Sequence, residues 1–387
     1  MMSSLIKLGP LNINRERWLD AFVAFSSVHV VELSHDSEPE LGDGFIYHYL
    51  PRSLANIFLV KVCHYSRKRK WCRPFVLVSV SLLRFLNYRW INEICSIDSN
   101  EVLASYNDFD DSGILTILLG NKLKDSGKRL TRSYKETRPE YDAFEEKAFS
   151  LSDRIVLNAE ECIDFFEKKY GNELFDDKEM LTNLDEDWLS EAQINGIEIR
   201  EKLSVADHRL HAVILAGRVM SDQTDVRSGS RLFYLPMIRG MIKAGIVVHL
   251  HTLKVIPDSN GVNRYALLEK EFPDLFHIEA PLNMEGAGIH EALSILSRYD
   301  LGVLHNYIEG TSNSAFDQYN IAHRYYEYQA AGVVPILEEG RTIVMERMMR
   351  EGNSGILYRS FSEITNTAHI TFHCPSFKQY IEALFSE

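Results

Sequence analysis

The chain has 387 residues, of which 45% are hydrophobic and 25% charged, and its formal net charge is −13. This composition is typical of a folded globular protein, and the length exceeds that at which single hydrophobic cores stop growing, so we expect more than one domain. The acidic balance argues against nucleic acid as a partner.

Cysteine usage and hydropathy indicate a compartment and exclude some classes of protein. The chain has five cysteines, none in a C-x2-C pair, which favours a reducing cytoplasm and predicts neither a zinc site nor a disulfide framework. The most apolar stretch, Phe75–Leu86, is about half as long as the ~20 residues that a membrane-spanning helix needs. The N-terminus lacks a signal-peptide cleavage pattern, so we expect a cytoplasmic protein without a spanning segment.

In the first half of the chain, short apolar runs alternate with longer amphipathic ones. The predicted strands are Leu5–Leu8, Val28–Leu33, Phe45–Leu50, Glu101–Ser105, Arg129–Tyr134 and Arg154–Leu157. The predicted helices are Asn14–Phe25, Phe75–Ile94, Gly113–Leu123, Glu140–Ser150 and Glu160–Tyr170. This alternation favours parallel βαβ units.

Between Phe175 and His208 the pattern weakens and acidic residues accumulate, which predicts a boundary between domains of residues 1–182 and 183–387. The predicted strands of the second half are Ala212–Ala216, Ile246–His251, Leu275–Glu279, Leu301–His305 and Val333–Leu337. The predicted helices are Arg231–Ala244, which Pro236 either kinks or begins, Ile289–Arg298, Tyr319–Ala331 and Lys378–Phe385. We therefore expect an α/β fold of two Rossmann-like doubly wound domains that face each other across a cleft, with ligands at the carboxyl ends of the strands.

One helix carries residues suited to a charged ligand. In HRYYEYQAAGVVPIL, which begins at His323, Arg324 and Glu327 lie one helical turn apart on the same face. A guanidinium can grip an anionic group, and a carboxylate can accept hydrogen bonds from a neighbouring diol. The alternative is a surface ion pair worth about 0.3–0.5 kcal/mol.

This stretch resembles the donor-site helix of GT-B glycosyltransferases. The large retaining family that uses nucleotide sugars (family 4-like) has the typical form P-N-K-L-F-E-Y-L-A-A-G-x-P-V-I. The resemblance implies that Glu327 holds the nucleotide ribose and that Arg324 approaches the diphosphate. HAVILAGRV, from His211, is similar to the V-L-Y-A-G-R-L that opens the family's donor domain, which implies donor contacts from Gly217 and a catalytic, phosphate-binding role for Arg218.

The next motif of the family is a basic residue and a glycine that open the following helix. Arg227-Ser228-Gly229 occupies that place, and Ser228 replaces the usual lysine, so either Arg227 or Arg231 would supply the charge. Positive charge and a helix N-terminus would both stabilise the departing nucleoside diphosphate. Such sites need no metal ion, so we expect no metal and no cofactor besides the nucleotide sugar, which is a substrate.

The first half shares further motifs with the family. ASYND (Ala104–Asp108) stands at its H-A-H-D, SYKE (Ser133–Glu136) at its D-S-H-E, and EEKAFSLSDRIVLNAEECIDFFEKKYG follows its pattern. The residues implied in acceptor binding are Gly9, Asn107, Asp108, Tyr134 and Glu136. Lys135 stands where the family has the histidine that faces the donor sugar, and is a candidate catalytic residue.

The resemblance implies transfer of a sugar from a nucleotide-diphosphate sugar to a glycan, lipid-linked or other hydroxyl acceptor, with retention. The departures are Ser228, Lys135 and Tyr319; the last stands at the first acid of the family's Glu-x7-Glu, so the contact of that acid with the sugar hydroxyls is either missing or made by Asp317. A nucleotide-sugar epimerase of the same fold and a non-catalytic scaffold therefore remain alternatives.

A basic cluster precedes the most apolar stretch. It consists of Arg67, Lys68, Arg69 and Lys70, followed by Trp71. Anionic lipid attracts such residues by about 1 kcal/mol each, which predicts a peripheral location at the inner face of a membrane. The alternative is a solvated basic loop.

Overall fold

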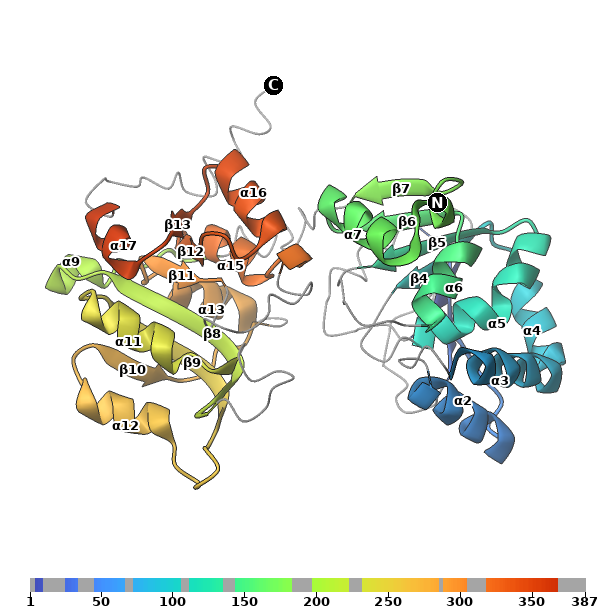
Figure 1. The fold of residues 1–387 in the computed structure, drawn as a ribbon, viewed down its shortest axis with the longest axis horizontal. Helices are drawn as coiled ribbons and strands as arrows, with labels where there is room; N and C mark the ends of the chain where they lie inside the picture. Colours follow the sequence, from blue (N-terminus) through green and yellow to red (C-terminus); the bar gives the residue numbers. More distant parts are fainter. Residues whose placement is uncertain are drawn as a thin grey trace. The chain divides into compact units, whose positions relative to one another are not determined.

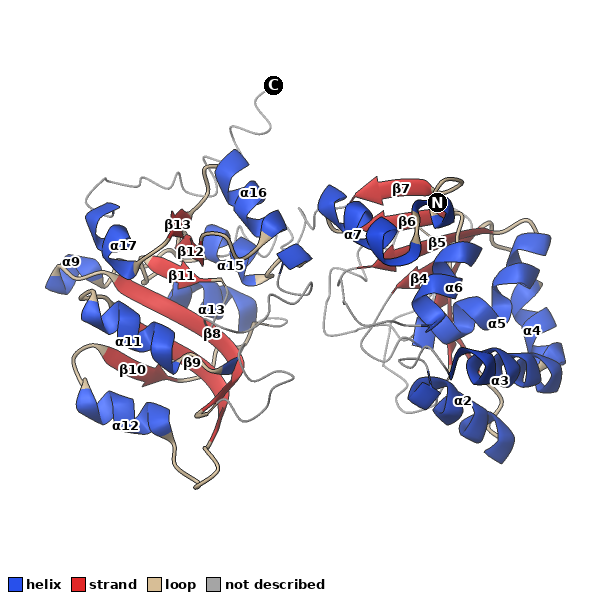
Figure 2. Ribbon diagram, in the orientation of Figure 1, coloured by secondary structure: helices blue, strands red, loops and turns tan. Residues whose placement is uncertain are grey.

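The chain folds into two units, which are described separately. The computed structural model in Figure 1 describes residues 4–9, 25–33, 45–66, 72–105, 111–134, 143–182, 197–222, 232–284, 288–304 and 318–367. Unit 1 is Met1–Glu186 and unit 2 is Asp187–Glu387. Each unit builds its own parallel sheet with helices packed on it (Figure 2), so the prediction of two Rossmann-like doubly wound α/β domains is confirmed.

The sheet of unit 1 has the strand order β3-β2-β1-β4-β5-β6-β7, and all neighbouring strands are parallel. Its strands are β1 (Leu5–Leu8), β2 (Val28–Glu32), β3 (Phe45–Tyr49), β4 (Glu101–Ser105), β5 (Arg129–Tyr134), β6 (Arg154–Leu157) and β7 (Glu179–Thr182). The strand order reverses between β1 and β4. Ligands of open parallel sheets bind outside the carboxyl ends of the strands at such a reversal, which here follows Leu8 and Ser105.

Two helices of unit 1 form an antiparallel hairpin, α2 (Leu54–Ser66) and α3 (Arg73–Leu86). The side-chain amide of Asn56, near the start of α2, exchanges hydrogen bonds of 2.8 and 2.9 Å with that of Asn87, directly after α3. The prediction of one helix over Phe75–Ile94 is wrong. Asn87, with φ of −115° and ψ of 26°, lies outside helical geometry and separates α3 from α4 (Tyr88–Cys95); its side chain also donates to the Leu83 carbonyl at 2.8 Å.

The remaining helices of unit 1 connect its later strands. They are α5 (Asp111–Asp125), α6 (Ala143–Leu151) and α7 (Glu160–Tyr170), with a 3-10 turn at Asn172–Leu174. Gly171 ends α7 with φ of +94°, a conformation that glycine adopts without strain. Helices α2 to α6 contribute to one hydrophobic core with β1, β2, β4 and β5.

The sheet of unit 2 has the strand order β10-β9-β8-β11-β12-β13, again wholly parallel. Its strands are β8 (His211–Met220), β9 (Val247–Ile256), β10 (Phe276–Glu279), β11 (Leu301–Val303), β12 (Val334–Glu338) and β13 (Ile356–Tyr358). The order reverses between β8 and β11, so the segments after these two strands leave the sheet in opposite directions. A ligand of this unit is therefore expected between them.

Strands β8 and β9 are longer than their neighbours. Strand β8 pairs with β11 only at Ala212 and Val213, whereas its pairing with β9 continues to Met220. The two strands thus extend beyond the rest of the sheet as a two-stranded ribbon. The prediction that the strand ends at Gly217 is wrong, because β8 runs through the exposed Gly217 without a turn and its pairing with β9 resumes at Arg218.

The helices of unit 2 are α9 (Ser204–Asp207), α11 (Leu235–Lys243), α12 (Arg264–Glu271), α13 (Ile289–Leu296), α15 (Arg324–Ala330), α16 (Ile343–Glu351) and α17 (Phe361–Thr367). Pro236 lies in the first turn of α11, which is one of its two predicted places. Helix α15 begins later than predicted, at Arg324 rather than Tyr319. The predicted helix Lys378–Phe385 and most of Asn14–Phe25 lie outside the described residues. None of the described helices is long and apolar enough to cross a membrane.

A close contact in unit 2 fixes helix α15 against strand β11. Gly302, in the middle of β11, faces the ring of Tyr328, and a Cβ atom at Gly302 would lie 2.4 Å from that ring. The Tyr328 ring is fully buried, and its hydroxyl donates to the Val303 carbonyl at 3.3 Å. The absence of a side chain at Gly302 is what lets the helix lie this close to the sheet.

Gly302→Ala should therefore destabilise the protein, because the new methyl group forces the Tyr328 ring away from its site. We expect a loss of about 1–3 kcal/mol in the free energy of unfolding, measured by urea denaturation. Gly217→Ala is the matched control, since a Cβ atom there meets nothing within 4 Å. Equal stability of the two variants would contradict the proposed fit.

Candidate functional site

The strand-order reversal of unit 2 brings two helix starts together. Helix α11 follows β8 and begins beside Tyr234, and helix α15 follows β11 and begins at Arg324. The Arg324 guanidinium is close enough to Tyr234 for that tyrosine to raise the pKa of Arg324. Residues separated by 90 positions in the sequence are thus neighbours at the place where a ligand is expected.

Arg324 is the least satisfied charged group at this place. Its side chain is half-buried, and within the described part of the chain its Nη1 atom is buried without a hydrogen-bond partner. Burial opposes the charge, but Tyr234, Tyr328 and Glu327 outweigh it and raise the pKa of Arg324 above its ordinary value. A buried cationic donor without an acceptor is costly, so Nη1 is the donor at this place that an incoming anion would satisfy.

Helix α15 is held firmly behind this guanidinium. Gly332, with φ of +64°, ends the helix in the left-handed conformation, and the Val333 amide donates to the Tyr328 carbonyl at 2.8 Å. The Lys202 ammonium donates to the Gly332 carbonyl at 2.7 Å, and so binds one of the carbonyls left over at the helix end. Glu327 is half-buried on the helix that carries Arg324, so the structure places both predicted donor residues of this helix at the reversal.

Tyrosines also fix the other side of the site. The hydroxyl of Tyr265, on α12, accepts a hydrogen bond of 2.9 Å from the Tyr234 amide and donates to the Met220 carbonyl at 3.1 Å. It therefore ties the end of β8 to the start of α11. Sequence reasoning missed these tyrosines, although Tyr234 occurs at the start of an amphipathic run that Pro236 opens.

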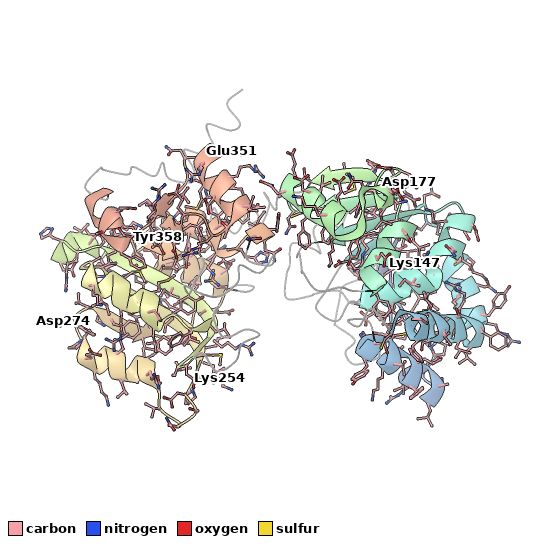
Figure 3. All side chains as sticks on the ribbon, viewed as in Figure 1. Lys147, Asp177, Lys254, Asp274, Glu351 and Tyr358 are labelled. Carbon is pink, nitrogen blue, oxygen red and sulfur yellow. The ribbon has the colours of Figure 1, made fainter. Side chains whose placement is uncertain are left out.

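Arg218 and Gly217 lie elsewhere than predicted. Both are exposed on the ribbon of β8 and β9, where Arg218 is directly opposite Lys254, a surface residue labelled in Figure 3. Arg218 is five positions beyond Val213, the last β8 residue paired with β11, which is roughly 16 Å along a strand at about 3.3 Å per residue. Among the described elements, β8 therefore carries Arg218 away from the strand-order reversal.

Six other predicted site residues fall in segments between the described ranges. Arg227, Arg231, Asn107, Asp108, Lys135 and Glu136 lie outside the described residues, as do Ser228, Asp317 and the basic cluster Arg67–Lys70. Tyr134 is the last residue of β5, and only its backbone is described. Tyr319 is half-buried in the segment before α15.

The corresponding reversal in unit 1 is tightly packed. Gly9 follows β1 with φ of +89°, and a Cβ atom there would lie 3.0 Å from the Cβ atom of Ser112 on α5. The hydroxyl of Ser112 accepts a hydrogen bond of 3.2 Å from Nη1 of Arg132, which is fully buried in β5. The predicted acceptor residue Gly9 is thus part of a close junction between β1 and α5.

Two further ionisable residues are buried near this junction and were missed in the sequence. Lys7 of β1 is buried, and its ammonium donates to the Leu8 carbonyl at 2.9 Å. Burial lowers the pKa of Lys7 to about 7; Glu32, at the end of β2, opposes this effect, and Arg132 adds to it. A lysine inside the otherwise apolar strand LIKL was the available sequence signal.

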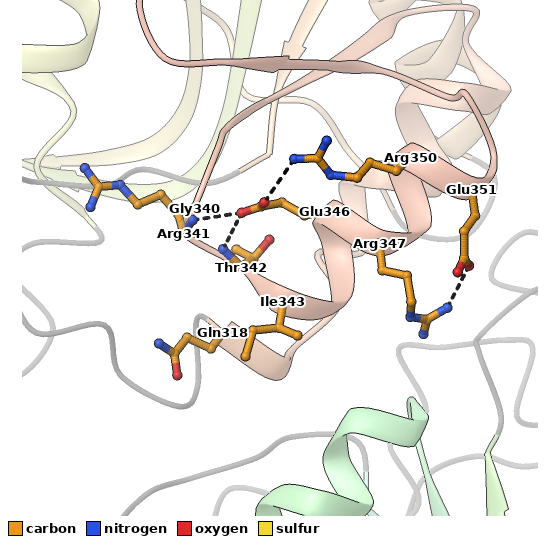
Figure 4. Close-up of a pocket in the computed structure, with 9 residues that line it drawn as sticks. All are labelled: Gln318, Gly340, Arg341, Thr342, Ile343, Glu346, Arg347, Arg350 and Glu351. Atoms are coloured by element: carbon orange, nitrogen blue, oxygen red, sulfur yellow. Dashed lines mark hydrogen bonds and ion pairs between the residues drawn. The ribbon is translucent and has the colours of Figure 1, made fainter.

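A cavity lies at the start of helix α16. It has a volume of about 530 Å³ and is lined by Gln318, Gly340, Arg341, Thr342, Ile343, Glu346, Arg347, Arg350 and Glu351 (Figure 4). The backbone amides of Arg341 and Thr342 donate to the Glu346 carboxylate at 2.8 and 3.1 Å. The arginines are paired with carboxylates, as between Arg347 and Glu351 at 2.9 Å, so this cavity offers no unsatisfied cation to an anionic ligand.

A chain of polar groups crosses the sheet of unit 2. Nε2 of His211 lies 3.0 Å from the Asp207 carboxylate, and its Nδ1 lies 2.9 Å from Nε2 of His249. Nδ1 of His249 lies 2.8 Å from the Glu279 carboxylate. Both imidazoles are buried, and both carboxylates are partly exposed. Burial lowers the pKa of His249 below its ordinary value, against the effect of Glu279.

No group of three or more His, Cys, Asp or Glu side chains among the described residues is placed to hold a metal ion. The expectation that the protein needs no metal stays a prediction.

No protein-family model matches the chain, and no curated protein does. Solved structures are similar to it at low identity. A putative UDP-N-acetylglucosamine 2-epimerase from Listeria monocytogenes has 10% identity and a TM-score of 0.44, over 97% of this chain and 89% of that one. UGT2 of Phytolacca americana, complexed with UDP-2fluoro-glucose and pterostilbene, has 10% identity and a TM-score of 0.43; the match covers 98% of this chain and 92% of that one. MurG of Acinetobacter baumannii has 9% identity and a TM-score of 0.40; the match covers 92% of this chain and 83% of that one. The fold assignment rests on the two sheets and not on these similarities.

The buried lysine of unit 1 gives a test of its environment. Between pH 7 and about 10, the unfolded chain keeps a proton on Lys7 that the folded protein has lost, so the stability of the wild type gains from rising pH. Lys7→Met removes this gain. The variant's free energy of unfolding relative to wild type should therefore fall with rising pH, by at most about 1.4 kcal/mol per pH unit. Lys168→Met, at an exposed lysine of α7, is the control. A pH-independent difference for Lys7→Met would show that the ammonium is not desolvated.

Proposed function

We propose that the protein is a GT-B glycosyltransferase that moves a sugar from a nucleotide-diphosphate sugar to a hydroxyl acceptor. The observation that carries the proposal is the Arg324 guanidinium, which is charged, partly buried and incompletely satisfied at the strand-order reversal of unit 2. A diphosphate offers the negative charge and the acceptor oxygens that this donor needs. Glu327, on the same helix, is suited to the ribose diol, as the HRYYEYQAAGVVPI motif implies.

The chemistry asked of these residues is electrostatic. As the bond between the sugar and the diphosphate breaks, the leaving group gains negative charge, and Arg324 would stabilise it without needing to reorient. In a retaining reaction the departing phosphate itself can take the acceptor proton, so the chain need not supply a base. Unit 1 would bind the acceptor near the β1–β4 reversal, where Gly9 lies, and unit 2 the donor.

Arg218 keeps a secondary place in this proposal. Its exposed position on the ribbon supports a contact with the outer part of a donor more than with the reversal itself. The roles of Arg227, Arg231 and Lys135 stay proposals from the sequence, as do retention and the nature of the acceptor. A lipid-linked acceptor would place the enzyme at a membrane.

Arg324→Ala should weaken the binding of a nucleoside diphosphate by about 10- to 100-fold, because it removes a charge-assisted donor worth about 1.5–3 kcal/mol. Arg324→Lys keeps the charge but loses the planar guanidinium, so its affinity for the nucleoside diphosphate should lie between those of Arg324→Ala and the wild type. Isothermal titration with UDP, GDP, ADP and TDP measures both. Arg239→Ala, which removes an exposed arginine paired with Glu271 on the same unit, is the control. Unchanged affinity in Arg324→Ala would return Arg324 to a structural role.

Glu327→Ala tests the ribose contact separately. The variant should lose affinity for ribonucleoside diphosphates but bind inorganic pyrophosphate as the wild type does, since pyrophosphate has no diol. An equal loss for both ligands would mean that Glu327 acts only through Arg324.

The products formed from a nucleotide sugar distinguish the candidate functions. Release of nucleoside diphosphate that depends on a hydroxyl acceptor supports glycosyl transfer. Conversion of the nucleotide sugar without an acceptor would identify an epimerase instead, and no binding of any nucleotide would indicate a scaffold.

A further inference from the structure

The α2–α3 hairpin of unit 1 exposes an unusual amount of apolar side chain. On α2 the exposed residues include Leu54 and Phe58, whose exposed fractions are 88% and 65%, and on α3 they include Phe75, Val78 and Phe85, the last 80% exposed. Their spacing of three, four or seven residues places them along one stripe of each helix. Large apolar side chains exposed together in this number are typical of an interaction site.

Both stripes point away from the core. The opposite side of α2 is buried through Leu59 and Cys63, and that of α3 through Val76, Val80 and Leu83, all in the same hydrophobic core. Figure 1 shows the two helices side by side, consistent with the paired amides of Asn56 and Asn87. The exposed stripes therefore form the outer face of one helical layer, here called the hairpin face.

The hairpin face is held rigidly. Arg84 turns inward from α3, and its guanidinium donates to the carbonyls of Ile117 and Leu118 on α5 at 2.7 and 3.2 Å. These bonds fix α3 to a helix that packs on the sheet. The apolar stripe is thus a permanent surface that needs no local unfolding to appear.

The charge around the hairpin is opposite to that of the whole protein. From Gly44 to Asn92 the sequence contains no Asp or Glu, although the formal net charge of the chain is −13. The same segment contains nine basic residues: Arg52, Lys61, Arg67, Lys68, Arg69, Lys70, Arg73, Arg84 and Arg89. Of these, Arg52, Lys61 and Arg89 are exposed on or beside the described helices, and Arg67–Lys70 join α2 to α3 in the sequence.

We propose that the hairpin face docks on an anionic lipid surface, with its apolar stripe in the interfacial layer and the exposed Arg52, Lys61 and Arg89 among the headgroups. Apolar side chains combined with an excess of Lys and Arg are what such a surface selects. A second copy of this chain fits less well, because two hairpin faces would bring like charges together. The α2 and α3 helices are too short to span a bilayer, so they would lie in its plane.

This inference does not depend on the proposed glycosyl transfer. The hairpin face involves none of the residues assigned to the donor, and lipid binding is measured without any nucleotide. Failure of one proposal would leave the other standing.

The test is flotation of the full-length protein with vesicles. Vesicles of phosphatidylcholine with about 30% phosphatidylglycerol should bind the protein at low salt, and pure phosphatidylcholine should bind it far less. Phe58→Asp combined with Phe85→Asp should lower binding by at least about tenfold, because each places a charge in the apolar stripe. Leu267→Asp, at an exposed residue of α12 in unit 2, is the matched control and should bind as the wild type does. Both altered positions are exposed, so the thermal midpoints should agree with that of the wild type.

A second measurement separates insertion from simple attraction. Phe85→Trp should gain tryptophan fluorescence that brominated phosphatidylcholine, mixed with phosphatidylglycerol, quenches, whereas Leu267→Trp should gain fluorescence that it does not quench. Binding that high salt abolishes and that the Phe58→Asp, Phe85→Asp variant retains would overturn insertion, leaving only attraction by the basic residues. Absence of lipid binding together with a dimer that the same variant dissociates would overturn the proposal in favour of a second copy.

Discussion

Both sheets are parallel and covered by helices on their faces, so side chains that point from their central strands are removed from water. An ionisable group in that position costs several kcal/mol unless other groups satisfy it. This constraint explains why Arg132 binds Ser112 and why the imidazoles of His211 and His249 are joined to each other and to carboxylates. Arg324 begins the helix that follows β11 at the strand-order reversal, and its buried Nη1 atom has no hydrogen-bond partner among the described residues, which makes it the candidate for an external ligand.

The sequence predicts the architecture well, because the alternation of strands and helices can be read from the local spacing of hydrophobic residues. It also places Arg324 and Glu327 on one helix. Among the boundaries that were wrong, two have identifiable reasons. Asn87 divides one apolar run into two helices through a side-chain pair with Asn56, a residue 31 positions away, which no local pattern records. Gly217 was taken for a strand end, whereas continued pairing with β9 carries the strand past it.

The candidate site was less predictable than the fold because its groups come from distant segments. Tyr234 and Arg324 become neighbours only through the strand order, and Tyr265 reaches the end of β8 from a helix two connections later. Lys7 and Arg132 look like ordinary charged residues in short strands until the sheet closes around them. Single residues of this kind become informative only when their burial is known.

Asp207, His211, His249 and Glu279 form a row of polar side chains joined by three contacts. Its three contacts need three protons, and two neutral imidazoles carry only two. If Nε2 of His211 donates to Asp207, its Nδ1 must accept from His249, and Nδ1 of His249 then faces the Glu279 carboxylate with no hydrogen between them. All three contacts can be hydrogen bonds only when the row holds one more proton than two neutral imidazoles supply, and the burial of His249, which lowers its pKa, opposes that proton. The row lies on one face of the sheet, because the strand register puts His211, His249 and Glu279 on the same side, and it links a partly exposed carboxylate on α9 to another on the edge strand β10.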